Sequence, residues 1–235
     1  VVESFRNDMF DGYKTGAGTP EDLMSQFDLA ERAVAALGVV VWPMVEFEAD
    51  DALATAAEKW RDAPNVEQVV ICSPDKDLTQ MVRGSQVVCL DRRRKVTLDD
   101  AGVREKFGVP PASIPDYLAL VGDAADGIPG VPRWGAKTAA QMLDRYGHLE
   151  NIPDDWEQWE VRPRGAQAVA ASLAEHREDA VLYKRLATLR LDVPWAETLE
   201  QLRWEGVPKL EYQALCAELG FESLMDLPSR WTGEE

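Results

Sequence analysis

The sequence predicts an α/β fold followed by an all-helical part, and three observations support this. Short apolar segments of strand character alternate with helical patterns up to about residue 98. From Asp99 onward the strand patterns stop, and helical segments separated by glycine and proline take over. With 235 residues, of which 46% are apolar, the chain is long and apolar enough to form a packed core.

The first part opens with a helical pattern. After Pro20, the residues Leu23, Phe27, Ala30 and Val34 recur at helical spacings, and the glycine at position 38 ends the pattern. The next elements, in chain order, are a strand over residues 39–42, a helix over 48–60, a strand over 69–72, the start of a helix over 78–82 and a strand over 87–90. Short apolar strands that alternate with helices predict a parallel sheet covered by helices on both faces.

The second part contains only helical patterns. They cover residues 99–107, 114–121, 136–146, 166–174, 180–189 and 210–219. Residues 151–165, with two prolines and four acids, are typical of a connector. A basic run, Arg92-Arg93-Arg94-Lys95, precedes this part. We interpret it as a solvated hairpin turn between two strands, with contact to a DNA backbone as the alternative.

Charge and composition limit the classes of function. The formal net charge is −17, whereas nucleic-acid binding usually leaves a basic footprint. No apolar run approaches the roughly 18 residues of a membrane span, so we expect no membrane partner. The three cysteines are widely spaced, without a Cys-x-x-Cys pair, which argues against a disulfide framework or a thiolate zinc site. We therefore expect a cytoplasmic protein.

Acidic residues gather in three clusters at element ends. Two clusters lie where strands meet helices, and ligands bind beyond the carboxyl ends of strands in open parallel sheets. Two carboxylates about 4 Å apart repel by roughly 4 kcal/mol, so converging acids need cations. Oxygen ligands without histidine or cysteine favour Mg²⁺ or Mn²⁺. Taken singly, each cluster also fits a solvated loop or a helix cap. The seven candidate ligands are Glu48, Asp50, Asp51, Asp75, Asp77, Asp123 and Asp126.

A glycine-rich segment over residues 122–140 is a candidate phosphate clamp. Two glycine turns flank a short apolar link, and a helix begins at Gly135 with Lys137 and Thr138 in its first turn. The start of a helix offers unpaired backbone N–H groups to a phosphate. Such a grip holds a strand without reading its bases. An ordinary helical hairpin with a surface lysine is the alternative interpretation.

Four ordered motifs resemble those of the bacterial and phage 5′-nucleases, the flap-endonuclease superfamily that includes the 5′→3′ exonuclease domain of DNA polymerase I. Phe5-Arg6 and Tyr13-Lys14 also resemble family motifs, and the similarity runs from about Glu3 to at least Glu150. The four motifs are Glu48-Ala49-Asp50-Asp51, Ser73-Pro74-Asp75-Lys76-Asp77-Leu78, Phe107-Gly108-Val109 and the segment from Leu120 to Pro132.

The resemblance implies a PIN-like catalytic domain over residues 1–108 and a helical domain over 109–235. A helix-three-turn-helix (helix-hairpin-helix) motif is expected at about 119–147. It further implies two-metal-ion hydrolysis of phosphodiester bonds near a 5′ end or flap, in replication or repair. The seven acids would hold the two divalent cations or their waters, and the resemblance assigns catalytic roles to Lys14, Asp50 and Asp75. The implied DNA contacts are Arg6, Lys14, Gly130, Val131, Arg133, Gly135, Lys137 and Thr138.

The resemblance also implies partners. These are DNA with 5′ ends or flaps, RNA primers as a further substrate, and K⁺ bound by backbone carbonyls of the helix-hairpin. The expected location is cytoplasmic and associated with the nucleoid. A Mg²⁺-dependent phosphatase of small substrates is a more distant alternative, which would leave the helix-hairpin without a purpose.

The sequence departs from the family pattern in three places. Two family acids and the first strand have no counterpart here, so we expect an N-terminally incomplete chain. A non-catalytic DNA-junction-binding module is the alternative. Ala17 stands where the family often has an arginine after Tyr-Lys, and Arg133-Trp134 stands where a glycine is usual. We expect Trp134 to pack in the core.

Overall fold

A computed structural model describes residues 3–233 of the chain. The chain forms two compact units. The first unit combines the segment that ends at Thr15 with Val45–Val193, and the second combines Gly16–Met44 with the segment that begins at Pro194. Each unit is thus built from two stretches of chain. The predicted division at residues 108 and 109 follows sequence motifs and stays a prediction.

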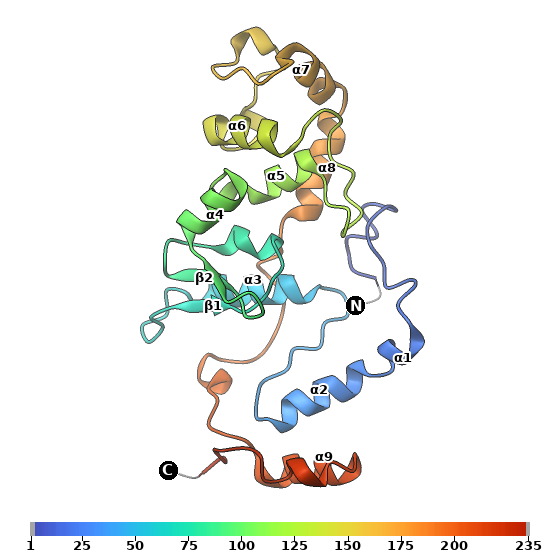
Figure 1. The fold of residues 1–235 in the computed structure, drawn as a ribbon, viewed down its shortest axis with the longest axis vertical. Helices are drawn as coiled ribbons and strands as arrows, with labels where there is room; N and C mark the ends of the chain where they lie inside the picture. The colour runs from blue at the N-terminus through green and yellow to red at the C-terminus, as the bar shows by residue number, and fades with distance from the viewer. Residues whose placement is uncertain (1–2, 234–235) are drawn as a thin grey trace. The chain divides into compact units, whose positions relative to one another are not determined.

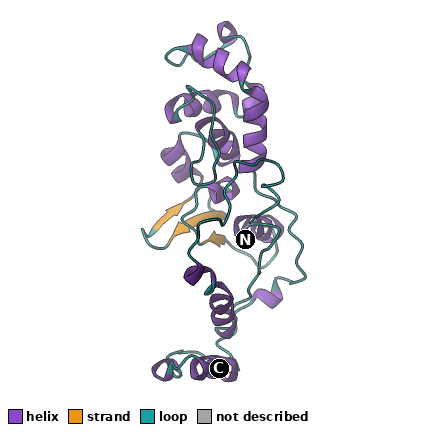
Figure 2. Cartoon of the chain, turned by 90° about the vertical axis from the view of Figure 1, so that its right-hand side faces the viewer, coloured by secondary structure: helices purple, strands orange, loops and turns teal. Residues whose placement is uncertain are grey.

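A three-stranded sheet lies in the first unit, drawn in orange in Figure 2. Its central strand β2 (Val87–Asp91) pairs in parallel with β1 (Val69–Ile71) and antiparallel with β3 (Val96–Leu98). The basic run forms the turn between β2 and β3, with Lys95 at φ 56°. The predicted strands over residues 69–72 and 87–90 and the hairpin turn are therefore confirmed. The sheet is mixed rather than purely parallel, because this turn reverses the chain.

The strand predicted over residues 39–42 is not formed. These residues carry no strand hydrogen bonds, and the side chains of Val39 and Val40 are 47% and 37% exposed. A strand needs a neighbour for its backbone N–H and C=O groups. This segment belongs to the second unit, whereas the three strands all belong to the first.

Helices pack against this sheet where the sequence places them. Helix α3 (Ala49–Trp60) contacts β1, and α4 (Asp100–Phe107) contacts β3. The predicted helix start after residue 77 is a 3-10 helix, η1 (Asp77–Met81), that contacts α3 and β2. Because Leu78, Ile71, Val87 and Cys89 are at most 3% exposed, the sheet and η1 share one core.

The remaining helices of the first unit confirm the all-helical part. They are α5 (Ile114–Val121), α6 (Ala136–Tyr146), α7 (Ala166–Glu175) and α8 (Arg177–Ala187), with short 3-10 turns at η2 (Pro111–Ser113), η3 (Leu149–Asn151) and η4 (Trp156–Gln158). Figure 1 shows α5 beside α8, and α6 packs on α5 as well. The buried Leu118, Met142, Leu143 and Leu186 fill this helical core.

The named elements among the described residues of the second unit are all helices. These are α1 (Glu21–Met24), α2 (Phe27–Ala36) and α9 (Lys209–Glu218), with η5 (Glu200–Leu202) and η6 (Glu222–Leu224). The single helix expected over residues 20–37 is broken at Ser25 and Gln26. Both side chains donate hydrogen bonds to the carbonyl oxygen of Asp22, at 3.0 and 2.8 Å. Such local bonds compete with helical hydrogen bonding.

None of the helices formed by residues 3–233 has the length and apolar character needed to cross a membrane.

Candidate metal centre and its surroundings

The first acidic cluster begins α3. Glu48 is the N-cap residue and forms a capping box with Asp51, whose Oδ2 accepts a hydrogen bond from the Glu48 N–H at 3.0 Å. Asp50, between them in the sequence, is half-buried. Burial, and then the charge of Asp75, raises the pKa of Asp50 to about 6. The charge of Asp75, from the second cluster, thus acts on Asp50 of the first cluster.

The second and third clusters converge. One carboxylate oxygen from each of Asp77, Asp123 and Asp126 lies within 4.8 Å of the other two, and all three residues are buried. The turn that carries two of them is closed by paired backbone hydrogen bonds between Asp123 and Ile128, both 2.8 Å. Burial, followed by the charges of Asp126 and Asp75, raises the pKa of Asp77 to about 8. Three buried acids this close together need compensating positive charge.

Two lysines supply part of that charge. Lys14 Nζ lies 2.8 Å from Glu48 Oε2 and 2.8 Å from Asp126 Oδ1, so it links the first cluster to the third. Burial lowers the pKa of Lys14, but hydrogen bonds to Asp126 and Glu48 outweigh it and raise the pKa above its ordinary value. Lys76 forms an ion pair with Asp123 and lies 3.8 Å from Asp77. The ammonium groups of Lys14 and Lys76 therefore each contact acids from two of the three clusters.

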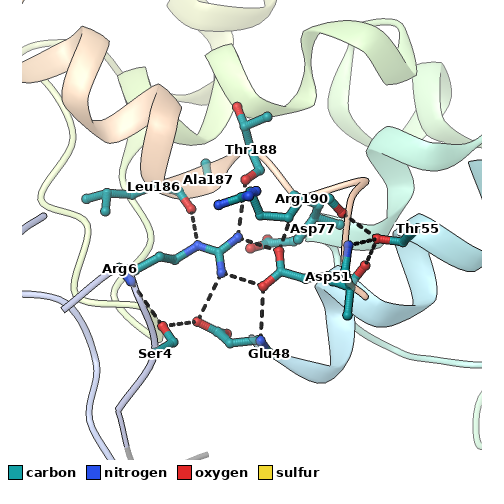
Figure 3. A network of polar contacts seen from close by, with 12 residues as sticks. Ser4, Arg6, Glu48, Asp51, Thr55, Asp77, Leu186, Ala187, Thr188 and Arg190 are labelled. Carbon is teal, nitrogen blue, oxygen red and sulfur yellow. Dashed lines mark hydrogen bonds and ion pairs between the residues drawn. The ribbon is translucent and has the colours of Figure 1, made fainter. Parts of the chain in front are cut away.

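The carboxylate of Asp51 binds the guanidinium of Arg6 (Figure 3). Arg6 Nη1 and Nη2 donate to Asp51 Oδ2 and Oδ1, each at 2.8 Å, and the Arg190 N–H donates to Oδ1 at 2.9 Å. Asp51 is 0% exposed and Arg6 is 1% exposed. Burial lowers the pKa of Arg6, but the ion pair with Asp51 more than reverses this effect. The structure thus gives Asp51 an ion-pair partner in place of the predicted cation.

The resemblance implies that Arg6 contacts DNA, but in the structure this side chain is buried. Its Nε donates to the Leu186 carbonyl oxygen at 2.8 Å, and Nη2 donates to that of Thr188 at 3.2 Å (Figure 3). A guanidinium that is buried and bonded on every side has no donor left for a phosphate. Its role here is to hold the start of α3 against residues 186–188.

Residues 186–190 were not identified from the sequence, although they support both acidic loops. Gln80 Nε2 donates to the carbonyl oxygens of Ala187 at 3.0 Å and Asp77 at 2.9 Å, and Gln80 Oε1 accepts from the Leu189 N–H at 3.0 Å. Gln80 therefore ties the second cluster to the segment that Arg6 ties to the first. The only sequence signal for this contact is a polar residue, Gln80, one turn after Asp77 in a predicted helix.

The predicted clamp residues divide into buried and exposed groups. Gly130 and Val131 are buried, and the Val131 N–H donates to the Leu120 carbonyl oxygen at 2.9 Å. These two residues shape the turn, so their predicted contact with DNA does not fit their burial. Gly135, the N-cap residue of α6, is exposed. Arg133 and Lys137 are exposed as well, and Thr138 is half-buried.

Two details explain the departure of this segment from the family pattern. Arg133 has φ 71°, a left-handed conformation in which glycine is usual. Trp134 is 3% exposed, donates from Nε1 to the Val169 carbonyl oxygen at 3.2 Å and packs edge-on against Trp159. The predicted packing role of Trp134 is confirmed, and Arg133 keeps the turn shape at some cost in backbone strain.

Comparison with protein families gives a consistent assignment for both parts of the chain. Residues 2–108 match the 5′-3′ exonuclease N-terminal resolvase-like domain, and residues 109–209 match the 5′-3′ exonuclease C-terminal SAM fold. The chain belongs to the 5′-3′ exonuclease family. The 5′-3′ exonuclease of Buchnera aphidicola is 33% identical over 202 residues, which cover 85% of this chain and 69% of that protein.

DNA polymerases I are also relatives of this 5′-3′ exonuclease family member. That of Bacillus caldotenax is 34% identical over 99% of this chain, and that of Pseudomonas aeruginosa is 37% identical over 95%. The chain spans about a quarter of the length of these polymerases, 26% and 24%. Whole-polymerase activities are therefore not carried over to it.

Solved structures share the fold. The T5 D15 protein co-crystallised with metal ions has a TM-score of 0.64 and 19% identity, over 96% of this chain and 79% of that one. A complex of the T5 D15 flap endonuclease with DNA and metal ions has a TM-score of 0.61 and 17% identity, over 96% of this chain and 77% of that one.

The residues of this exonuclease fold fit divalent cations. Oδ1 of Asp77 is buried and accepts no hydrogen bond from any described residue, although Lys76 lies 3.8 Å away. An ionised oxygen buried without a donor is costly unless a cation takes that place. Asp77, Asp123 and Asp126 would hold one ion. Carboxylate oxygens without imidazole or thiolate are the donor set of hard divalent ions.

Proposed function

We propose that the chain is a structure-specific 5′-nuclease that hydrolyses DNA phosphodiester bonds next to a 5′ end or flap, using two Mg²⁺ or Mn²⁺ ions. The observation that carries this proposal is the convergence of Asp77, Asp123 and Asp126. Lys14 supports it by bridging Glu48 and Asp126 across the same site. The DNA and metal ions bound by the T5 D15 protein support the substrate class and the cofactor class.

Two sets of side chains would each hold one of the two metal ions. Glu48, Asp50 and Asp75 are proposed to hold the ion that is not held by Asp77, Asp123 and Asp126. When bound, a pair of such ions lowers the pKa of water and stabilises the attacking and leaving oxygens of a phosphodiester. Cations on the carboxylates would free the Lys14 ammonium from its two acidic partners. Lys14 would then offset negative charge on the scissile phosphate.

The helix-hairpin would hold the substrate. The first turn of α6 offers backbone N–H groups, and exposed Lys137 adds a cation beside them. We propose that Gly135, Lys137, Thr138 and Arg133 contact phosphates and that carbonyls of this turn bind K⁺. Because phosphate contacts do not read sequence, the substrate would be chosen by its 5′ end or flap. A role in replication or repair in the cytoplasm, with RNA primers as further substrates, follows from this proposal.

The nuclease is tested with a 5′-flap DNA labelled at its 5′ end. Cleavage should require Mg²⁺ or Mn²⁺ and should be lost in the double variant Asp75→Ala with Asp77→Ala. The matched control is Asp144→Asn, an exposed acid of α6 distant in sequence from the clusters. Binding of the flap DNA without any cleavage by the unaltered chain would instead favour the junction-binding module. Cleavage that persists in the double variant would contradict the assigned metal centre.

The helix-hairpin is tested by the salt dependence of DNA binding. Lys137→Ala should weaken binding to all sequences alike and lower the slope of log affinity against log salt by about one. Arg145→Ala removes another exposed cation of α6, one already paired with Glu160 at 2.7 Å, and should leave the slope unchanged. Equal slopes for the Lys137 variant and the unaltered chain would remove Lys137 from the interface.

A further inference from the structure

A depression lies directly beyond the end of β1, next to the proposed metal centre. It consists of two adjoining hollows, and the less open one has a volume of about 180 Å³. Both hollows are lined by Ser73, Pro74, Asp75 and Lys106. The second hollow also reaches Lys76, the partner of Asp123. The depression therefore shares its inner edge with the second acidic cluster.

Positive side chains line this depression together with the carboxylates of Asp75 and Asp91. Lys106 comes from the end of α4 and Arg94 from the turn between β2 and β3. In the part of the chain from residue 3 to 233, Lys106 forms no ion pair with a carboxylate, and its Nζ lies 5.0 Å from the centre of the Phe107 ring. Arg94 is 76% exposed in its side chain and contacts Asp91 at 3.3 Å. The ammonium group of Lys106, beside the proposed metal centre, is thus able to bind an anionic ligand.

The interior of the depression indicates where the Lys106 charge acts. Cys89 lines its wall, and burial raises the pKa of the Cys89 thiol to about 12, while the positive charge of Lys106 opposes that shift. Pro74, Val96 and Leu98 contribute apolar surface. Cations over an apolar wall suit a sugar–phosphate unit, whose sugar packs on carbon and whose phosphate needs a positive partner.

We propose that this depression, lined by Lys106 and Arg94, binds the phosphate backbone of the DNA strand at the metal centre. The proposal rests on the proposed nuclease function and adds a second contact surface to the helix-hairpin. A chain with net charge −17 repels DNA over much of its surface, so each unpaired cation near the acids matters for guiding the strand. The turn between β2 and β3 gains a function as one side of this path.

The test compares two cations of one helix. Lys106→Ala removes the proposed contact, and Arg104→Ala removes an exposed cation of α4 that is already paired with Asp100 at 2.9 Å and does not line the depression. Affinity for a 5′-flap DNA is measured by fluorescence anisotropy at several salt concentrations, with Ca²⁺ as the divalent ion and product formation monitored in parallel. Lys106→Arg keeps the charge and serves as the rescue variant.

We expect Lys106→Ala to lower the salt slope by about one, whereas Arg104→Ala and Lys106→Arg keep the original slope. An unchanged slope for Lys106→Ala, with a lowered slope for Lys137→Ala, would overturn this inference and leave the nuclease proposal standing. Absence of DNA binding by the unaltered chain would instead overturn the proposed function. A loss of affinity shared equally by Arg104→Ala would show a general charge effect and also overturn the inference.

Discussion

At the scale of single residues, the buried ion pair of Arg6 and Asp51 supports the start of α3. Both side chains are buried, and the guanidinium of Arg6 donates two hydrogen bonds of 2.8 Å to the carboxylate of Asp51. Asp51 also accepts from the backbone of Glu48, so the pair fixes the residue that begins the first acidic cluster. A charge buried in this way is stable only while its partner is present.

Removing Arg6 should therefore destabilise the chain strongly. Arg6→Met leaves a buried carboxylate without its counter-charge, which costs about 3 to 5 kcal/mol of the free energy of unfolding. Arg104→Met is the control, because an exposed helical ion pair contributes about 0.5 kcal/mol or less. Chemical denaturation of both variants measures the difference. If the two variants lost equal stability, the Arg6 pair would have no supporting role.

The buried acids make the pH dependence of stability unusual. The folded-state pKa values of Asp77 and Asp50 are raised to about 8 and about 6, above the ordinary value of 3.8. The folded chain then binds more protons than the unfolded chain between these values, so stability falls as pH rises. In the presence of a chelator, the melting temperature should decrease from pH 5 to pH 8.

The same measurement on Asp77→Asn isolates the cause. The substitution removes the acid with the more raised pKa, so the melting temperature should vary less between pH 6 and pH 8. Asp144→Asn should keep the original pH profile. A melting temperature that increases over this range in the unaltered chain would contradict the raised pKa values.

Among structural elements, the turn from α5 to α6 depends on two backbones in close approach. Gly122 and Gly130 have φ values of 88° and 75°, and a Cβ on Gly130 would lie 2.5 Å from the Gly122 nitrogen. The turn between them carries Asp123 and Asp126, so its shape sets the third acidic cluster. Gly135, in contrast, has an ordinary φ of −95°, and a Cβ added there would meet no atom within 4 Å.

Gly130 and Gly135 provide a matched pair of substitutions. Gly130→Ala should destabilise the chain by at least about 1 to 2 kcal/mol, because left-handed backbone is costly for alanine and the methyl group meets backbone atoms. Gly135→Ala should change stability by less than about 1 kcal/mol. Thermal unfolding of both variants measures these two changes in stability. Equal stability of the two would show that the turn relaxes freely.

The sequence predicts elements best where local patterns decide them. Helices α3 to α9 lie within three residues of their predicted starts, because apolar spacing and capping residues are local signals. The three acidic clusters were also readable, because each lies at the end of a predicted element. The failed strand over residues 39–42 shows the limit: an apolar tetrapeptide forms a strand only if tertiary structure supplies a partner.

The supports of the site could not be read from the sequence for the same reason. Arg6 and Leu186 are 180 residues apart, and the contact between them depends on how α8 ends beside α3. Likewise, Gln80 meets Ala187 across 107 residues. Such contacts leave no periodic pattern, so the sequence alone groups Asp51 with the acids beside it and not with its buried partner Arg6.

At the scale of the whole molecule, the balance of charge couples metal binding to substrate binding. The net charge is −17, and seven of the acids responsible belong to the three clusters. Without divalent ions, these carboxylates repel a DNA strand that approaches Lys14. Cations on the carboxylates reduce this repulsion, and DNA phosphates in turn favour cation binding, so the two ligands should bind cooperatively.

This coupling can be measured without cleavage by using Ca²⁺, which also prefers oxygen ligands. The affinity for a 5′-flap DNA should rise as Ca²⁺ is added, beyond the change produced by a neutral salt of equal ionic strength. In Asp123→Asn with Asp126→Asn, two negative charges are gone, so affinity in chelator should exceed that of the unaltered chain while the Ca²⁺ response shrinks. The variant Asp144→Asn, altered outside the clusters, should keep the full Ca²⁺ response. A response of equal size in the double variant would show that Ca²⁺ acts on the DNA or elsewhere on the surface, and not through the acids that converge with Asp77.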